Sequence, residues 1–302
     1  MKHIPVLEKE MVEALCVREN AIVVDGTVNG GGHAETITKL LGPKGIYIGI
    51  DLDQNALDNT RDRLANVLCK VYLEQSNYRN INRVLEKLGI ETVDGAFFDL
   101  GLSSNQLEES GRGFSFLKDE PLLMTFKRRE NITENDITAE EIVMTWDEEH
   151  IADILYGYGE ERFSRKIARQ IVKTRSETPI KTTTDLLRVI ESAVPTWYTK
   201  KKTHFATKTF QALRITVNDE VESLREGLTK ATDALNENGR IAVLSFHSIE
   251  DRIIKHFFIQ QKKEGTGIII TKKPITPSKE EIKKNPRSRS AKLRIFEKYT
   301  KK

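Results

Sequence analysis

Three short apolar runs, rich in β-branched residues and separated by helical patterns, dominate the first hundred residues. The runs and the residues that close them are Ala21–Val24 with Asp25, Ile46–Ile50 with Asp51, and Val93–Phe98 with Asp99. The intervening helical patterns are Ala34–Leu41, Ala56–Leu68 and Ile81–Leu88, and a further short strand fits Val71–Leu73. This alternation predicts an α/β protein whose Rossmann-like parallel sheet is covered on both faces. Because ligands of such sheets bind beyond the carboxyl ends of the strands, the three aspartates are expected at the binding edge.

The alternation stops at about residue 103 and resumes at about residue 205. Residues 103–204 show mostly helical periodicity, which predicts an inserted helical substrate domain between two parts of one core, 1–102 and 205–302. The elements expected after the insert are a long helical segment at Thr207–Leu235, a strand at Arg240–Ser245, a helix at Ile249–Gln260, and late strands at Gly267–Thr271 and Leu293–Glu297.

The 302-residue chain has a net charge of only +3, yet its basic residues are concentrated at the end. Residues 262–302 contain fourteen Lys or Arg and four Asp or Glu, a surplus of ten that leaves residues 1–261 at −7. Such asymmetry fits a polyanionic partner and fits a solvated basic tail equally well. With no signal sequence and no long apolar run, we expect a soluble cytoplasmic protein without membrane contact. Cys16 and Cys69 stand far apart, so neither a disulfide nor a metal site is expected.

The segment DGTVNGGG, from Asp25 to Gly32, is typical of a turn that binds a ligand, because glycine lets the backbone approach closely and adopts positive φ. A dinucleotide-binding turn would carry a third glycine where Glu35 stands, so an NAD-dependent oxidoreductase becomes the weaker alternative. A carboxylate before the turn would also repel a pyrophosphate and attract a cation. S-adenosylmethionine, with its ammonium and sulfonium charges, is therefore the favoured cofactor.

Asp51 and Tyr78, which follow the turn in the sequence, indicate a nucleoside-binding site. Asp51 lies about twenty residues past the glycines, where Rossmann-like folds place an acid that accepts the ribose hydroxyls. Tyr78 follows the strand at Val71–Leu73 and could stack on an adenine ring. Each has a structural alternative, since Asp51 could shape a turn with Asp53 and Tyr78 could simply pack on the sheet.

Two further side chains are expected at the same edge of the sheet. Asp99 could hold the cofactor or orient an amine for methyl transfer, although the Asn/Asp-Pro-Pro-aromatic signature of many amino-group methyltransferases is absent. His247 follows the strand at Arg240–Ser245, and a purely structural histidine is its alternative. Ser248 and Asp251 have the spacing of a capping box for the next helix.

Three groups of basic residues could contact a nucleic acid or could be solvated surface. They are Arg162, Lys166, Arg169 and Lys173 opposite an apolar stripe of Phe163, Ile167 and Ile171; Lys208 and Arg214 with Gln211 on one side of a second helix; and Arg287 and Arg289 in the tail segment Asn285–Lys292.

A series of motifs runs in order along almost the whole chain. They are HIPVL at 3–7, GGGH at 30–33, DLGLSSNQL at 99–107, RGFSF at 112–116, YGEERF at 158–163, TFQALRI at 209–215, SFHS at 245–248, and NPR and RS within 285–290. Together they resemble the RsmH (MraW) family of bacterial 16S rRNA (cytosine-N4)-methyltransferases. The resemblance implies S-adenosylmethionine-dependent methylation of a decoding-centre cytidine, cytosine 1402, in the small ribosomal subunit.

The resemblance also assigns residues. It implies cofactor contacts at Gly31, Gly32, His33, Asp51, Tyr78, Asp99 and Gln106. Asp99 is the candidate catalytic residue and His247 a second one on the substrate side, while Lys208, Arg214, Arg287 and Arg289 are candidates for contact with RNA.

Some positions depart from the family pattern. Asn29 stands for a glycine and Tyr78 for a phenylalanine, and Leu123 and Thr125 replace an Asp and an Arg. The last two departures keep open a non-catalytic or altered-specificity RNA-binding paralogue.

Overall fold

The computed structural model describes residues 5–103, 106–107, 110–134 and 136–299. Contacts divide the chain into two compact units. The sheet unit combines Met1–Ser103 with Val221–Lys302, and the helical unit is Ser104–Glu220. The second boundary thus lies at Glu220 and not at residue 204, because helix α11 (Thr207–Asn218) packs on α6 (Ala139–Thr145) and α7 (Glu148–Gly157) of the helical unit.

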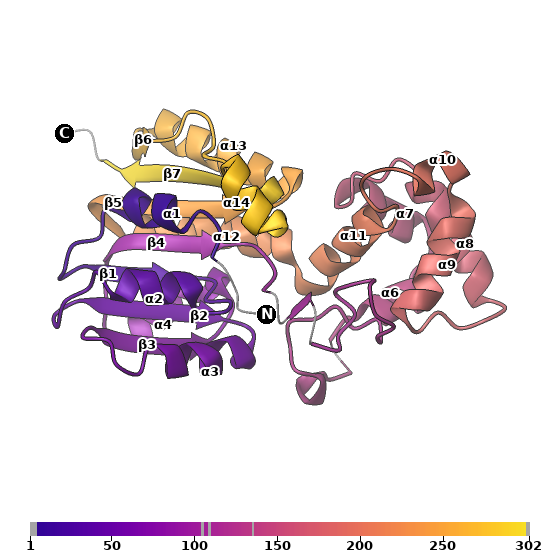
Figure 1. Ribbon diagram of the computed structural model, residues 1–302, viewed down its shortest axis with the longest axis horizontal. Coiled ribbons are helices and arrows are strands. Elements are labelled where there is room, and N and C mark those ends of the chain that lie inside the picture. The colour runs from indigo at the N-terminus through magenta and orange to yellow at the C-terminus, as the bar shows by residue number, and fades with distance from the viewer. Residues whose placement is uncertain (1–4, 104–105, 108–109, 135, 300–302) are drawn as a thin grey trace. The chain divides into compact units, whose positions relative to one another are not determined.

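Within the described residues, the sheet unit contains a seven-stranded sheet in the order β3-β2-β1-β4-β5-β7-β6 (Figure 1). Its strands are β1 (Ile22–Asp25), β2 (Ile46–Asp51), β3 (Lys70–Gln75), β4 (Val93–Asp99), β5 (Leu235–Ser245), β6 (Gly267–Ile269) and β7 (Lys292–Lys298). The first five strands run parallel, and β7 is antiparallel to both β5 and β6. The predicted Rossmann-like sheet is confirmed. Since β2, β1 and β4 are neighbours, Asp51, Asp25 and Asp99 end adjacent strands at one edge.

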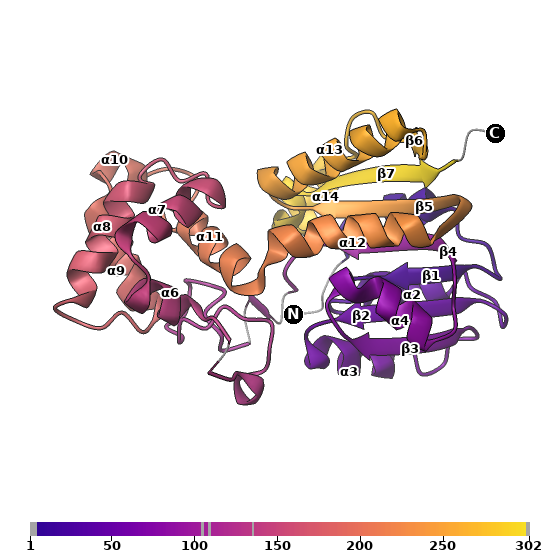
Figure 2. The ribbon, with the colours of Figure 1, turned by 180° about the vertical axis from the view of Figure 1, so that it is seen from behind.

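Successive residues of the central strands face opposite sides of the sheet, as the two-residue period of a strand requires. Val23 and Phe97 belong to one buried cluster, whereas Val24 and Phe98 belong to another. Helices cover both faces, as the predicted parallel sheet requires; Figures 1 and 2 show α1 and α2 in front of the sheet and α4, α12 and α13 behind it. The helices of this unit are α1 (Glu8–Leu15), α2 (Gly32–Thr38), α3 (Gln54–Arg63), η1 (Tyr78–Asn80), α4 (Ile81–Lys87), α12 (Glu220–Ala234), α13 (Ser248–Glu264), α14 (Lys279–Lys284) and η3 (Pro286–Ser290).

The described part of the helical unit contains helices and no named strand. Besides α6, α7 and α11, these are η2 (Arg129–Asn131), α8 (Ser164–Arg175), α9 (Thr183–Ala193) and α10 (Thr196–Thr199). On α8 the apolar and basic stripes separate as their spacing predicts. Ile167 and Ile171 are fully buried, while Lys166 and Lys173 are exposed.

The helical segment expected at Thr207–Leu235 is in fact two helices, α11 and α12. Asp219 between them adopts the left-handed conformation with φ 47°, and its N–H donates to the carbonyls of Ile215 and Thr216. Aspartate tolerates this conformation better than most residues, so a single polar residue ends one helix inside a pattern whose periodicity continues.

Candidate active site

The glycine-rich turn joins β1 to α2 through two residues in the left-handed conformation. Asn29 has φ 52° and Gly31 has φ 74°. A Cβ atom on Gly31 would lie 2.6 Å from Oγ1 of Thr60 on α3, so glycine is required there by space as well as by conformation. Asn29 adopts the conformation for which glycine is usually chosen, at the modest cost that asparagine incurs.

Asp51, at the end of β2, shapes this turn through its carboxylate. Its Oδ2 accepts the N–H of Asn29 at 2.8 Å, and its Oδ1 accepts the N–H of Asp53 at 2.8 Å. Asp51 therefore shapes a turn with Asp53, as the structural alternative predicts. Each carboxylate oxygen has a second lone pair, so these two bonds leave acceptor capacity for the hydroxyls of a ribose.

Two carboxylates at this edge are buried deeply enough to perturb their ionisation. Burial raises the pKa of Asp51 to about 7, against the N–H bonds from Asp53 and Asn29 that lower it. Burial likewise raises the pKa of Asp25 to about 6, although the hydroxyl of Tyr47 donates to its Oδ2 at 2.7 Å and the N–H of Thr27 donates to Oδ1 at 3.0 Å. An excess of buried acid at one edge favours a cationic ligand.

This burial predicts that the ligand-free protein loses stability as the pH rises. Asp25 and Asp51 have an ordinary pKa of 3.8 when unfolded and of about 6 and about 7 when folded. Between pH 4 and pH 7 the folded state binds more protons, so the free energy of unfolding falls with pH, by at most about 1.4 kcal/mol per pH unit for each group. Urea unfolding of the ligand-free protein at pH 5, 6, 7 and 8 checks this. Asp51→Asn should flatten the slope, and a wild-type stability that rises over this range would contradict the assignment.

His33, on the first turn of α2, connects the N-terminal segment to Asp99. Its Nε2 lies 3.0 Å from the carbonyl oxygen of Val6, and its Nδ1 lies 3.4 Å from Oδ2 of Asp99. Burial lowers the pKa of His33, but the hydrogen bond and the charge of Asp99 outweigh burial and raise it. Because both ring nitrogens face acceptors, we infer that the imidazole is protonated and donates to both.

Asp99 is held at four points, which fixes the carboxylate at the end of β4. Its Oδ1 accepts the N–H of Gly101 at 3.1 Å, while His33 lies beside its Oδ2. The backbone N–H of Asp99 donates to Oγ1 of Thr27 at 2.5 Å. Nδ2 of Asn29 donates to its carbonyl at 2.9 Å. Asn29 therefore connects Asp51 with Asp99. The sequence pattern of the glycine-rich turn does not specify these two contacts.

Tyr78, the first residue of η1, lies against the sheet. Its ring is 5.2 Å from that of Phe98, and a Cβ on Gly227 of α12 would lie 2.5 Å from Tyr78 Cδ2. Tyr78 thus packs on the sheet on one side of its ring, as the structural alternative predicts, and its side chain remains partly exposed. Gln106 belongs to the helical unit, where it is buried and its carbonyl accepts the hydroxyl of Ser110 at 2.6 Å.

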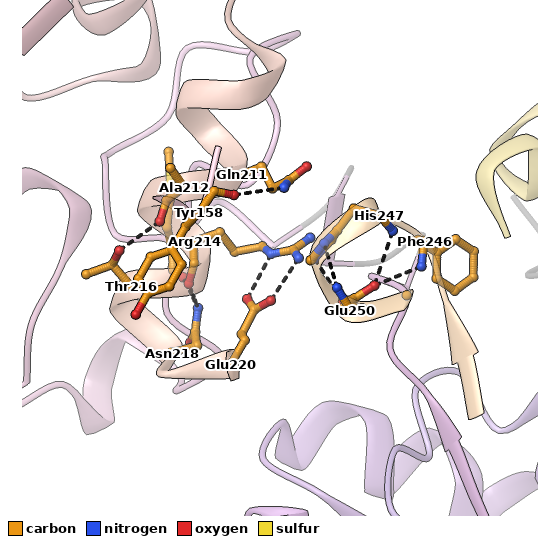
Figure 3. Close-up of polar contacts among 12 residues, drawn as sticks. Tyr158, Gln211, Ala212, Arg214, Thr216, Asn218, Glu220, Phe246, His247 and Glu250 are labelled. Atoms are coloured by element: carbon orange, nitrogen blue, oxygen red, sulfur yellow. Dashed lines mark hydrogen bonds and ion pairs between the residues drawn. The ribbon is translucent and has the colours of Figure 1, made fainter. Parts of the chain in front are cut away.

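His247 caps α13. Its Nδ1 accepts the N–H of Glu250 at 3.4 Å, its Nε2 lies 3.0 Å from Oε1 of Glu250, and Oε2 of Glu250 accepts the N–H of Phe246 at 2.8 Å (Figure 3). The capping box is therefore His247 with Glu250, one residue earlier than expected. The predicted pairing of Ser248 with Asp251 is wrong because Ser248 is already inside the helix and Asp251 binds Lys292 and Arg294 of β7.

The cap predicts how variants at residue 247 behave. Asparagine is a good N-cap, so His247→Asn should keep both the free energy of unfolding and any activity of the site close to wild type. His247→Ala should lower the free energy of unfolding by about 1 kcal/mol. Chemical denaturation and a turnover assay of both variants measure this. A large loss of turnover in a stable His247→Asn protein would instead place the imidazole at the substrate.

The basic residues of α11 bind groups of their own unit. Nε and Nη2 of Arg214 each donate to Glu220 at 2.8 Å, as Figure 3 shows, and Nζ of Lys208 donates to the carbonyl of Glu160 at 2.6 Å. Gln211 between them donates to the carbonyl of Tyr158 at 3.0 Å. These contacts order the helical unit, and contact with RNA by Lys208 and Arg214 stays a prediction.

Basic residues of the tail lie on β7 and on η3. Arg294 Nε donates to Asp251 at 2.7 Å and Lys292 Nζ at 2.9 Å, so these two join β7 to α13. Arg287 and Arg289, on η3, are exposed. They stay predicted contacts with RNA.

Leu123 and Thr125, the positions that depart from the family pattern, lie in an ordered loop of the helical unit. The carbonyl of Leu123 accepts the N–H of Ala139 at 3.2 Å, and the hydroxyl of Thr125, which is buried, accepts the N–H of Lys127 at 3.3 Å. Met124 between them has φ 52°. The loop is thus built without the two charges of the family pattern.

Among the described residues, no helix combines the length and the apolar character that crossing a membrane requires.

Comparison with known proteins covers both units. The family model described as the MraW methylase family matches residues 1–299. Relatives named "Ribosomal RNA small subunit methyltransferase H" align with 98% of this chain. That of Clostridium botulinum is 44% identical over 99% of its length, that of Brevibacillus brevis 43% over 98%, and that of Heliobacterium mobile 45% over 98%.

Proposed function

The chain belongs to the MraW methylase family, and we propose that it transfers a methyl group from S-adenosylmethionine to the N4 amine of a cytidine in small-subunit ribosomal RNA. The names of the relatives, which match over nearly their whole length, support the RNA substrate. The family resemblance of the motifs supports the decoding-centre cytidine of 16S rRNA and its N4 atom. The observation that carries the proposal is the connection of Asp51, Asn29, Asp99 and His33 at one edge of the sheet.

The residues at this edge suit a nucleoside that carries positive charge. Three carboxylates are buried there, those of Asp25, Asp51 and Asp99. The basic side chain that contacts them is His33, which lies beside Asp99. Asp51 would accept the ribose hydroxyls, Tyr78 would lie along the adenine, and Gly31, Gly32 and His33 would line the methionine end. A pyrophosphate in this acidic surrounding would be repelled, which keeps NAD the weaker alternative.

When bound, S-adenosylmethionine supplies an electrophilic sulfonium methyl group, so that transfer to an amine leaves one proton to be released. Asp99 is the residue that we expect to orient the amine by accepting a hydrogen bond from one of its N–H groups. Gly101 and His33 hold its two oxygens and prevent the carboxylate from rotating. No covalent cysteine step is expected. Burial raises the pKa of the Cys69 thiol. Cys16 contacts Arg240, which pairs with Gly95, toward the opposite end of β4 from Asp99.

The decisive experiment uses small ribosomal subunits from cells that lack the modification. The purified protein and S-adenosylmethionine are incubated with these subunits, and the digested RNA is analysed for N4-methylcytidine by mass spectrometry. We expect methyl transfer to one cytidine, and none when the protein is omitted. Absence of transfer to subunits and to free RNA, from a protein that binds the cofactor, would overturn the proposal.

A second candidate is an RNA-binding paralogue without catalysis. The observation that favours it is the replacement of two charged residues of the family pattern by Leu123 and Thr125. The double variant Leu123→Asp/Thr125→Arg tests it in the same assay. Transfer that appears only in this variant would establish the second candidate.

A further inference from the structure

An exposed aromatic residue of the helical unit lies between cations. Trp197 on α10 is 49% exposed, although large aromatic side chains are usually covered. The guanidinium carbon of Arg162 lies 5.1 Å from its ring centroid, and Nζ of Lys201 lies 5.1 Å from the same centroid. Phe163 extends the cluster, with its ring 6.0 Å from that of Trp197 and with Arg162 and Lys166 over it at 5.0 Å and 5.8 Å.

A buried carboxylate holds this cluster in place. Glu161 is fully buried, and its Oε2 accepts the hydroxyl of Tyr198 at 2.7 Å while its Oε1 accepts the N–H of Phe163 at 2.8 Å. Burial raises the pKa of Tyr198, so its hydroxyl remains a donor at neutral pH. Because Tyr198 is anchored inward on this four-residue helix, its neighbour Trp197 is fixed at the surface.

The chain segment that contains Trp197 carries positive charge only. Residues 196–208 contain four lysines and no acidic residue, and Lys200, Lys201 and Lys202 are exposed. In the part of the chain that the structure describes, Arg162, Lys166 and Lys201 make no ion pair with a carboxylate, whereas Arg169 on the same face pairs with Glu148 at 3.4 Å. Cations that contact rings and not acids remain available to an anionic partner.

We propose that Trp197 and Phe163, with Arg162, Lys166 and Lys201, bind a single-stranded segment of the RNA substrate, by stacking of a base on the tryptophan and contact of the cations with phosphates. Single-stranded nucleic acids are recognised by this combination of aromatic faces and basic side chains. The inference rests on the proposed function. It adds a contact surface around the start of α8 and around α10 that the transfer chemistry does not use.

Tryptophan emission reports on this surface directly. The chain has two tryptophans, so Trp146→Phe leaves Trp197 as the sole reporter. Titration of that protein with a twelve-nucleotide oligouridylate should quench the emission in a saturable way, because a stacked base quenches the indole. Inorganic polyphosphate, which has the charge without the bases, should compete for the cations and leave the emission unchanged.

Matched variants separate stacking from charge. In the full-length protein, Trp197→Ala should weaken oligouridylate binding about tenfold and Trp197→Phe much less, because phenylalanine retains a stacking face. Arg162→Gln and Lys201→Gln should each reduce the salt dependence of binding by about 0.7 in the log–log slope. The control is Lys262→Gln/Lys263→Gln, which removes two exposed cations at the end of α13 in the sheet unit and should not change the Trp197 signal.

The outcomes distinguish this inference from the proposed function. Saturable quenching without methyl transfer would leave the RNA-binding surface in place and overturn the enzymatic proposal. Methyl transfer without quenching, or a Trp197→Ala protein that binds oligouridylate like wild type, would overturn the surface. About half of the Trp197 side chain is covered, so Trp197→Ala should lower the unfolding midpoint, and binding is measured at a temperature at which every variant is fully folded.

Discussion

Replacing Asp99 by alanine should reduce methyl transfer by about 10²-fold or more while S-adenosylmethionine still binds. The carboxylate is buried and fixed by Gly101 and His33, so it is the group at this edge that can accept an N–H of the target amine in a constant orientation. The measurement is single-turnover transfer of a labelled methyl group to unmethylated small subunits, with the cofactor dissociation constant determined separately by calorimetry.

Asp99→Asn is the control for folding. Asparagine fills the same space and keeps one acceptor oxygen, yet it removes the charge that raises the pKa of His33. Transfer should fall in this variant too, and the pKa of His33, followed by NMR, should drop, because the lowering effect of burial is then no longer outweighed by the charge of Asp99. Near-normal turnover in either variant would remove Asp99 from the mechanism. A loss confined to cofactor affinity would make it a binding residue only.

The backbone of this site is encoded in short stretches of sequence. Runs of β-branched residues that end in Asp25, Asp51 and Asp99 give the parallel strands β1, β2 and β4, and the shape of a parallel sheet then brings the three carboxylates to one edge. The apolar stripe on α8 similarly predicts which face is buried, because helical periodicity and burial express the same geometry.

The contacts that position the side chains depend on residues far apart in the chain. His33 is held by the carbonyl of Val6, and Asn29 contacts both Asp51 and Asp99, which no local pattern specifies. The same limit applies to helix ends. The left-handed Asp219 and the cap at His247 depend on single residues within patterns that continue past them, so their exact positions come from the structure.

Basic residues show most clearly why charge patterns alone were ambiguous. Arg214 and Lys208 share a helix side and were candidates for RNA contact, yet both donate to acceptors of their own unit. Arg162 and Lys201 carry the same charge and instead lie over aromatic rings at the surface. Sequence spacing predicts which basic side chains share a helix face. It does not predict whether each of them contacts a carboxylate or an aromatic ring.

The affinity for S-adenosylmethionine should depend on pH through Asp51. A ribose hydroxyl donates to the ionised carboxylate, and burial raises the pKa of that carboxyl to about 7 in the ligand-free protein. Ionisation must precede or accompany binding, so the dissociation constant should increase about tenfold from pH 8 to pH 6. Calorimetry across this range, with the released or absorbed protons measured in two buffers, checks the prediction.

Asp51→Asn separates this effect from the other groups that titrate nearby. Asparagine has a single acceptor oxygen, so it cannot accept the N–H groups of Asn29 and Asp53 as both carboxylate oxygens do. We expect affinity at pH 8 to fall about 10- to 100-fold, the loss of a hydrogen bond to a charged group. The variant should also lose most of the pH dependence. Any slope that remains belongs to Asp25, whose pKa burial raises to about 6, to His33, whose pKa Asp99 raises, or to the amino group of the cofactor itself. An Asp51→Asn protein that keeps the wild-type affinity and slope would show that this carboxylate only shapes the turn.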